Sequence, residues 1–347
     1  MRPRRCSATV LGLLLLAPAL VSCGGGGGGV EVGDVVPARE DAQFADQGVE
    51  STVALPIGRL EVTTGAAVRE ISASDTRQLE RLEAPDGSVF VPMTWQYDAA
   101  TFGELSAYLD TDASPVIDLV ADGASYRLPA PEASGEGAES FYVLVSGKGD
   151  DPQLKVDFDG VAQQVDLSSG EVEPGRAADL YDLAKPKAKR FPCEPDVAYG
   201  RTTLRPPEFT CGVTRPVRLP YAGDAWAEDG HSWLVVTVRT TLGRWNEIAD
   251  DLKSGAVYYA ASVESSYRLG STEASEVLQD EANTTCPDPA ANASCTAEFH
   301  VVFDVAGKAP KALTIEQDYG LLLATAFGGG EHEDSLDLSV TAKARLK

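Results

Sequence analysis

The sequence predicts a mostly β protein with two tandem antiparallel β-sandwich domains, and three observations support this prediction. From about Ser51 onward, short runs of alternating apolar and polar residues are separated by turn residues, which is the pattern of half-buried strands. Some neighbouring runs are joined by an Asp-Gly pair, which favours a tight hairpin turn. The same succession of features occurs twice along the chain, which indicates a duplicated unit.

Two hairpins are predicted in the first unit, with turns at Asp122-Gly123 and at Phe158-Asp159-Gly160. Aspartate followed by glycine tolerates the positive φ angles that a two-residue hairpin turn requires. The strands that flank these turns are expected at residues 116–121, 124–128, 153–157 and 161–167.

The duplication is seen in five short matches that keep the same order in both units. One pair of segments places apolar residues at i, i+3 and i+7, so we expect a short helical insertion in each domain, at residues 102–109 and 245–252. The matched segments, first unit against second, begin at Asp86 and Asp229, Phe102 and Trp245, Ser125 and Ser266, Phe141 and Phe299, and Val165 and Leu336.

The first 22 residues have the features of an export signal. Three arginines precede an apolar run at residues 10–21, which is too short to span a hydrocarbon core of ~30 Å. The run ends in Leu20-Val21-Ser22-Cys23, a sequence that resembles the bacterial lipobox. The resemblance implies cleavage before Cys23 and attachment of a diacylglycerol to its thiol, which would hold the protein in the lipid bilayer. An ordinary secretory signal with an incidental cysteine is the alternative.

These features divide the chain into five parts. A run of six glycines follows Cys23 and has no side chains to pack, so it is expected to act as a flexible spacer. The basic run from Lys185 to Arg190 stands out in an acidic protein. It is interpreted as a solvated linker, and the alternative is a docking strip for an acidic partner or a contact between the domains. The parts are the signal at 1–22, the lipidated cysteine and tether at 23–50, the first domain at 51–170, a linker at 171–191 and the second domain at 192–347.

The composition excludes nucleic acid as a partner. The chain has 29 basic and 53 acidic residues, and removal of the signal takes away three of the basic residues and none of the acidic ones. Such a chain is repelled by phosphate backbones and by anionic lipid headgroups. A solvated acidic surface suits an exposed, extracytoplasmic protein.

Four cysteines remain after Cys6 in the signal and the lipidated Cys23 are set aside. They form an even set in an exported protein, so disulfides are expected. Pairing within each close couple is the simplest of three connectivities, Cys193 with Cys211 and Cys286 with Cys295. A zinc site is disfavoured because no CxxC is present and the chain has only three histidines.

The two units and their hairpins resemble the immunoglobulin-like β-sandwich domains of lipoproteins from actinobacteria and other Gram-positive bacteria. The resemblance is one of architecture, and it implies no functional residues. The first unit contains no cysteine, so the Cys-Trp-Cys core of antibody domains is absent.

Few residues suggest chemistry. His231 follows a turn and His300 lies in an alternating strand, so structural or exposed positions are favoured for both. His332 lies in a loop rich in glycine and acidic residues, where a polar hairpin tip is favoured over a cation site. Asp157 and Asp159 fit the outer face and turn of a hairpin, because the further acids of an EF-hand are missing. We therefore predict no catalytic residue, no metal and no cofactor.

The leading functional hypothesis is a non-catalytic lipoprotein, anchored to the outer face of the cytoplasmic membrane. Its two sandwich domains would bind an envelope protein, an envelope polymer or another ligand through edge strands or loop tips. Two alternatives are a solute receptor for a membrane transporter or sensor and a cell-envelope hydrolase. The receptor alternative is disfavoured because such receptors alternate strand and helix.

Overall fold

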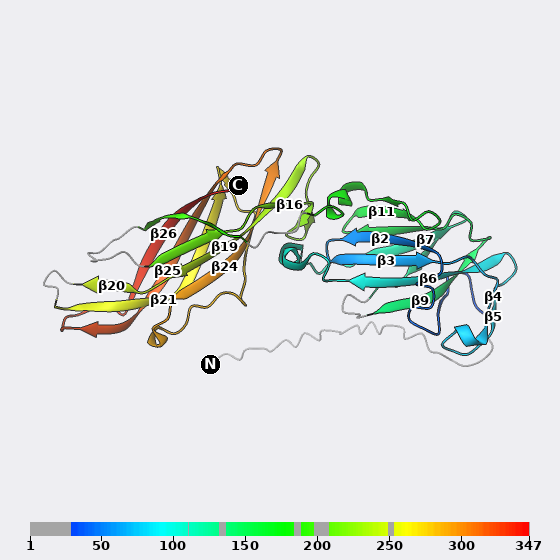
Figure 1. Cartoon of the computed structure of the whole chain (residues 1–347), viewed down its shortest axis with the longest axis horizontal. Helices are drawn as coiled ribbons and strands as arrows, with labels where there is room; N and C mark the ends of the chain where they lie inside the picture. Colours follow the sequence, from blue (N-terminus) through cyan, green and yellow to red (C-terminus); the bar gives the residue numbers. More distant parts are fainter. Residues whose placement is uncertain are drawn as a thin grey trace, which may run out of the picture.

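The computed structural model describes residues 29–109, 111–131, 137–183, 189–197, 208–248 and 253–346. Figure 1 shows two β-sandwiches that follow one another along the long axis of the molecule. All strand pairs in them are antiparallel, which confirms the predicted mostly β fold class. None of the helices in the described part of the chain is long and apolar enough to cross a bilayer. The short helices are η1 (Ala73–Asp75), η2 (Gly103–Leu105), α1 (Ser106–Leu109), η3 (Gly175–Leu180) and η4 (Pro289–Ala291).

The first domain packs two five-stranded sheets face to face. Their inner faces are apolar because alternate residues of each strand point inward, and Trp95 packs edge-on against Phe141 there, with 4.7 Å between ring centroids. One sheet has the order β1 (Val35–Pro37), β9 (Ala138–Ser146), β6 (Ser88–Asp98), β3 (Gly58–Thr64) and β2 (Val49–Leu55). The facing sheet has the order β12 (Val172–Glu173), β11 (Val161–Asp166), β10 (Gln153–Phe158), β7 (Val116–Ala121) and β8 (Ala124–Leu128).

Both predicted hairpins of this domain are confirmed. Asp122 and Gly123 have φ angles of 48° and 78°, and Asp159 and Gly160 have 48° and 77°, which are the left-handed values that such turns require. The first turn joins β7 to β8 and the second joins β10 to β11.

The second domain repeats this arrangement with longer strands. Its core is divided between two clusters, in which large rings such as Tyr258, Tyr319 and Phe303 are fully buried. One sheet has the order β13 (Phe191–Pro192), β15 (Phe209–Val213), β19 (His231–Leu242), β24 (Cys295–Ala306) and β23 (Glu276–Gln279), with β16 (Val217–Leu219) also paired to β19. The other has the order β14 (Glu194–Val197), β26 (Ser335–Arg345), β25 (Ala312–Phe327), β21 (Gly255–Leu269) and β20 (Trp245–Ile248), with β22 (Thr272–Glu273) paired to β21.

The central strands of the two domains correspond in chain order and in sheet position. Strands β2, β3, β6 and β9 occupy the places that β13, β15, β19 and β24 occupy in the second domain. Likewise, β7, β10 and β11 correspond to β21, β25 and β26. The edges differ, because β9 is flanked by the early strand β1 whereas β24 is flanked by β23, which lies in the long segment between β22 and β24. This correspondence supports the predicted duplication.

Two details of the predicted repeat are wrong. Ser125 lies in β8 but Ser266 lies in β21, the counterpart of β7, so this match joins strands that are not equivalent. The helical insertion is present in the first domain as η2 and α1, but Trp245 to Ile248 form strand β20 in the second. The rest of that predicted helix, residues 249–252, lies outside the described residues. The long strand β21 offers a free edge for β20 to pair with, whereas the shorter β7 begins only at Val116. Short apolar runs do not distinguish helix from strand, and here the neighbouring edge decides.

The folded part of the chain begins earlier than the predicted boundary at Ser51. Strand β1 pairs with β9, with Val35 opposite Val143, and Phe44 is buried. These residues form an outer layer over the β9–β6 face, together with the small hairpin of β4 (Glu70–Ile71) and β5 (Leu82–Glu83). The reason is that Phe90 and Leu144 point away from the main core and need a cover of their own.

The predicted linker at 171–191 is also largely part of the domains. Strand β12 extends a sheet of the first domain, and Ala177 and Leu180 of η3 are buried against Ala54 and Val161. Strand β13 pairs with β15 of the second domain. Residues 184–188, which include most of the predicted basic strip, lie outside the described residues.

Two hairpin strands extend from the second domain toward the first. Strands β17 (Tyr221–Ala222) and β18 (Ala225–Trp226) pair with each other beyond β16. Figure 1 shows this extension between the two sandwiches.

Candidate functional site

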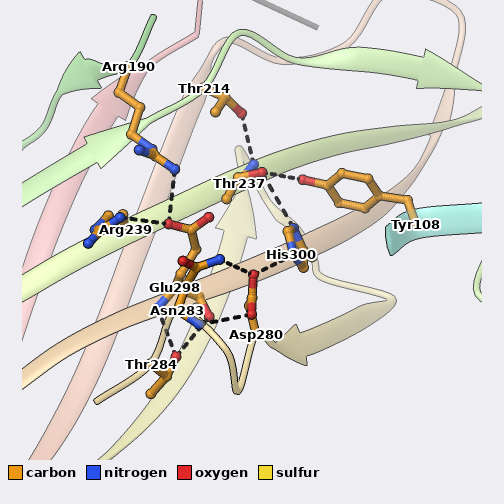
Figure 2. A network of polar contacts seen from close by, with 10 residues as sticks. All are labelled: Tyr108, Arg190, Thr214, Thr237, Arg239, Asp280, Asn283, Thr284, Glu298 and His300. Carbon is orange, nitrogen blue, oxygen red and sulfur yellow. Dashed lines mark hydrogen bonds and ion pairs between the residues drawn. The ribbon is translucent and has the colours of Figure 1, made fainter. Parts of the chain in front are cut away.

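The junction between the two domains contains a network of polar side chains of the second domain, and Tyr108 of the first domain contacts it, as Figure 2 shows. Helix α1 of the first domain lies against β24 and β17 of the second. From α1, the Tyr108 hydroxyl lies 2.7 Å from the Thr237 hydroxyl on β19. The Tyr108 ring also meets the His300 ring edge-on, with 4.9 Å between the centroids. Burial raises the pKa of Tyr108 above its usual value, so its hydroxyl stays protonated and can donate to Thr237.

His300 lies between a hydroxyl and a carboxylate. Its Nδ1 atom is 3.5 Å from the Thr237 hydroxyl oxygen, and its Nε2 atom is 3.5 Å from the Asp280 carboxylate. Asn283 orients that carboxylate, since its side-chain amide donates at 2.7 Å and its backbone N–H at 3.1 Å. These hydrogen bonds, the amide first, lower the pKa of Asp280, because they favour the charged form.

Glu298 is the buried charge of this network. It lies on β24 with only 6% of its surface exposed. Arg190 approaches its carboxylate at 2.9 Å and Arg239 at 3.5 Å. A buried carboxylate needs such partners, because an unpaired charge away from water is strongly destabilising. Arg190, the last residue of the basic run, therefore binds the second domain's own sheet.

The geometry of this network is better suited to holding the two domains together than to catalysis. Thr237, His300 and Asp280 follow one another as a nucleophile, a base and an acid would. However, both contacts of His300 are at the outer limit for a hydrogen bond, and the Thr237 hydroxyl is held at 2.7 Å by Tyr108. The Tyr108 ring also packs against the His300 imidazole. These side chains are therefore engaged in contacts that connect the two domains.

The other half of the junction is apolar. Tyr221 is fully buried, with Phe158 of the first domain and Trp226 at ring distances of 5.8 and 5.2 Å. The Trp226 indole N–H donates to the Phe158 carbonyl at 2.9 Å, and the Tyr221 hydroxyl donates to Thr111 at 3.2 Å. Both rings thus bury apolar surface and still satisfy their polar atoms across the junction.

A second feature is a groove of 890 Å³ in the outer layer of the first domain, here called the outer groove. Gln43 lies in it and binds three groups: its backbone N–H donates to Ser140 at 2.9 Å, and its amide donates to the Tyr142 hydroxyl at 3.1 Å and to a backbone carbonyl. Burial, with the charge of Asp75, raises the pKa of Tyr142 to about 12. The groove therefore combines these neutral groups and an apolar surface with charged residues. The apolar residues are Phe44, Val68, Ile71 and Pro92, and the charged ones are Arg39, Glu40, Glu70 and Asp75.

The predicted disulfides are present. Cys193 is joined to Cys211 and Cys286 to Cys295, which is the pairing that the sequence favoured. Cys23 lies outside the described residues, so its lipidation stays a prediction.

The three histidines lie apart, each beside one acidic residue. His231 contacts Asp304 at 2.7 Å, His300 contacts Asp280, and the His332 imidazole lies 3.9 Å from Glu247. Among the described residues, no three His, Cys, Asp or Glu side chains are placed to hold a metal ion. No histidine lines the outer groove.

The sequence matches no protein family, and no curated protein matches it.

Sequence reasoning did not find the junction residues. The spacing of apolar residues predicts a helix around Tyr108, but nothing near it in the sequence indicates a partner 129 residues away. The one available signal was in residues 219–226, where Tyr221 and Trp226 flank Gly223-Asp224. Such a short aromatic hairpin outside the repeated unit could have indicated a contact with another domain.

Proposed function

We propose that the chain is a lipid-anchored extracytoplasmic protein that binds an envelope protein or polymer and catalyses no reaction. The observation that supports this best is the buried apolar cluster that continues across the junction. Leu105, Tyr108 and Leu109 of the first domain belong to the same cluster as Leu219 and Tyr221 of the second. Domains joined by small polar interfaces move relative to one another, whereas a packed apolar interface holds them. The two sandwiches thus form one stiff body.

The path of the chain determines which end of this body would face the membrane. Strand β1 runs antiparallel to β9, and the Gly33 N–H donates to the Leu144 carbonyl near the end of β9. That end of the first domain is opposite the junction, since β9 begins beside Gln96 at the junction side of β6. From Cys23 to Val30 is seven residues, which reach at most about 25 Å. The second domain would therefore stand away from the bilayer.

A stiff body on a short tether suits a protein that presents binding surfaces at a fixed height above the membrane. The acidic composition suits this position, because it keeps the body off anionic headgroups. Its exposed edges and loops are the sites that sandwich domains use for recognition.

The test is capture of an envelope component by residues 30–347, which hold every described strand and helix. The bait is immobilised through its N-terminus, as the lipid would hold it. Envelope fractions are passed over the intact bait and over a Tyr108→Ala bait whose junction is loosened. We expect a component that is retained by the intact bait and elutes with salt or competitor. Failure of the intact bait to retain any component would contradict the proposal.

A second candidate, a solute receptor, is favoured by the outer groove alone. Its 890 Å³ falls within the range of small-molecule sites. Ala66 lines the groove and is exposed, so Ala66→Trp would fill the groove without disturbing the core. A receptor predicts that some small solute raises the melting temperature of the intact protein and of an Ala282→Trp control, but not of Ala66→Trp.

A further inference from the structure

A second groove, in the second domain, has a charge opposite to that of the whole protein. It has a volume of 610 Å³ and is here called the cationic groove. Its lining contains three basic residues and one acid, whereas the chain as a whole has 29 basic and 53 acidic residues. The lining residues are Phe191, Pro192, Glu194, Lys311, Ala312, Lys343, Ala344 and Arg345.

The fold builds this groove where the chain changes sheets. Strand β13 pairs with β15 in one sheet, and β14, two residues on, pairs with β26 in the other. Cys193 lies at this crossing and is bonded to Cys211 of β15. The disulfide fixes Phe191 and Pro192 beside the end of β26, so one wall of the groove is covalently held.

The alternation of β26 places its cations on the outer face. Ala342 and Ala344 are buried, so Lys343 and Arg345 point to solvent. In a strand, such alternate residues lie about 7 Å apart. Lys311 immediately precedes β25, whose first residue Ala312 is directly opposite Arg345, so the third cation lies close to the other two.

One acidic residue lies beside these cations, since Glu194 of β14 is directly opposite Lys343, but no ion pair joins the two. Lys311, Lys343 and Arg345 form no ion pair with any described residue. A fourth cation lies nearby, because the Lys189 ammonium is 5.8 Å from the centroid of the Phe191 ring that lines the groove. Unpaired like charges repel one another, and this arrangement is stabilised when an anion binds between them.

We infer that the cationic groove binds an acidic peptide segment of a partner protein in an extended conformation, an inference that rests on the proposed binding function. Alternate side chains of an extended peptide repeat at the same ~7 Å as Lys343 and Arg345. Acidic residues at alternate positions can therefore meet both cations. The intervening side chains would meet Phe191 and Pro192, whose apolar surface gives a phosphate polymer nothing to contact.

The experiment measures fluorescence anisotropy of a labelled peptide with alternating Glu and Val, added to residues 30–347. Lys343→Glu/Arg345→Glu reverses both outer charges, and Lys155→Glu is the matched control. Lys155 is exposed on β10 of the first domain and forms no described ion pair. We expect saturable binding that weakens at least tenfold in the double variant, is unchanged in the control, and falls as salt is raised. All three positions are exposed, so circular dichroism should show that each variant remains folded.

The same titration is repeated with a lysine-valine peptide and with inorganic polyphosphate. The inference is overturned if the acidic peptide does not bind, or if polyphosphate binds and the peptide does not. It is also overturned if the Lys343→Glu/Arg345→Glu variant binds the peptide as tightly as the Lys155→Glu control does. The envelope capture with residues 30–347 keeps the two proposals distinguishable. If intact and double-variant baits retain the same component, the protein binds a partner but not through this groove.

Discussion

The hydroxyl oxygen of Tyr108 lies 2.7 Å from that of Thr237, and this hydrogen bond joins a helix of the first domain to a strand of the second. The Tyr108 ring is buried between the domains, where it contacts His300 edge-on. One side chain thus contributes both a polar and an apolar contact to the junction. The stiffness of the two-domain body should depend on it.

Tyr108→Ala should destabilise the protein more than Tyr108→Phe. Phenylalanine loses only the hydrogen bond, worth about 1 kcal/mol. Alanine also leaves a cavity, which raises the cost to about 3–5 kcal/mol. Urea unfolding measures both values, and small-angle scattering measures the angle between the domains.

The control for this pair is Tyr126→Phe, which removes two hydrogen bonds with Ser146 within the first domain, one with its hydroxyl at 2.7 Å and one from its backbone N–H at 2.8 Å. It should lower stability by about 1–3 kcal/mol and leave the scattering profile unchanged. If Tyr108→Ala also leaves the scattering profile and the unfolding free energy unchanged, the junction does not hold the domains.

The hydrogen bonds between Asn283 and Asp280 should make the stability of the folded protein depend on pH. The pKa of Asp280 is lowered in the folded protein, so its hydrogen bonds contribute fully above the unfolded value of about 3.9. That contribution is lost as the pH falls below this value toward the folded pKa. Asn283→Ala should lower the melting temperature at pH 7, and its difference from the unaltered protein should shrink below pH 4.

Melting curves from pH 7 to pH 2 check this prediction. Asn246→Ala, a substitution on strand β20, is the matched control and should show no such convergence. A difference between Asn283→Ala and the unaltered protein that stays constant down to pH 2 would exclude Asp280 as its cause.

The two disulfides should contribute unequally. Cys193 and Cys211 close an 18-residue separation, and Cys286 and Cys295 close one of 9. In the chain-entropy description, these correspond to about 3 and about 2.5 kcal/mol. Replacing each pair by serine and comparing the urea midpoints tests the order. A larger loss for the shorter loop would show that native packing, not loop closure, dominates.

Residues 30–50 provide a test of where the first domain begins. Val36 lies in β1 and is 6% exposed, whereas Val32 is 48% exposed. Val36→Asp would bury an unpaired carboxylate and should cost about 3 kcal/mol or more, while Val32→Asp should change stability by less than about 0.5 kcal/mol. Thermal unfolding measures both, and equal, negligible effects would mean that this segment is a tether after all.

The sequence predicted the features that depend on local chemistry. Asp122-Gly123 and Asp159-Gly160 adopt the turn that their residue types require, and the strands around them lie where alternation placed them. Sequence spacing was also enough for the disulfides, because each cysteine lies close to its partner along the chain.

Features that depend on distant partners could not be read from local pattern. Trp245 has the same helical spacing as Phe102, but it pairs with Tyr258 because β21 is long enough to offer an edge. The outer groove likewise exists only because residues far apart in the chain cover Phe90 and Leu144. The sequence of a segment contains no information on the length of the strand beside it or on the apolar face that it will cover.

The most direct test of the central proposal, a body held on the membrane by a lipid, is fractionation of cells that express Cys23→Ala. Cys6→Ala is the matched control, since Cys6 lies in the segment that signal cleavage would remove. We predict that the unaltered protein and Cys6→Ala remain with the membrane and incorporate labelled fatty acid. Cys23→Ala should be released and unlabelled. Cys23→Ala that remained with the membrane would contradict the proposed anchor.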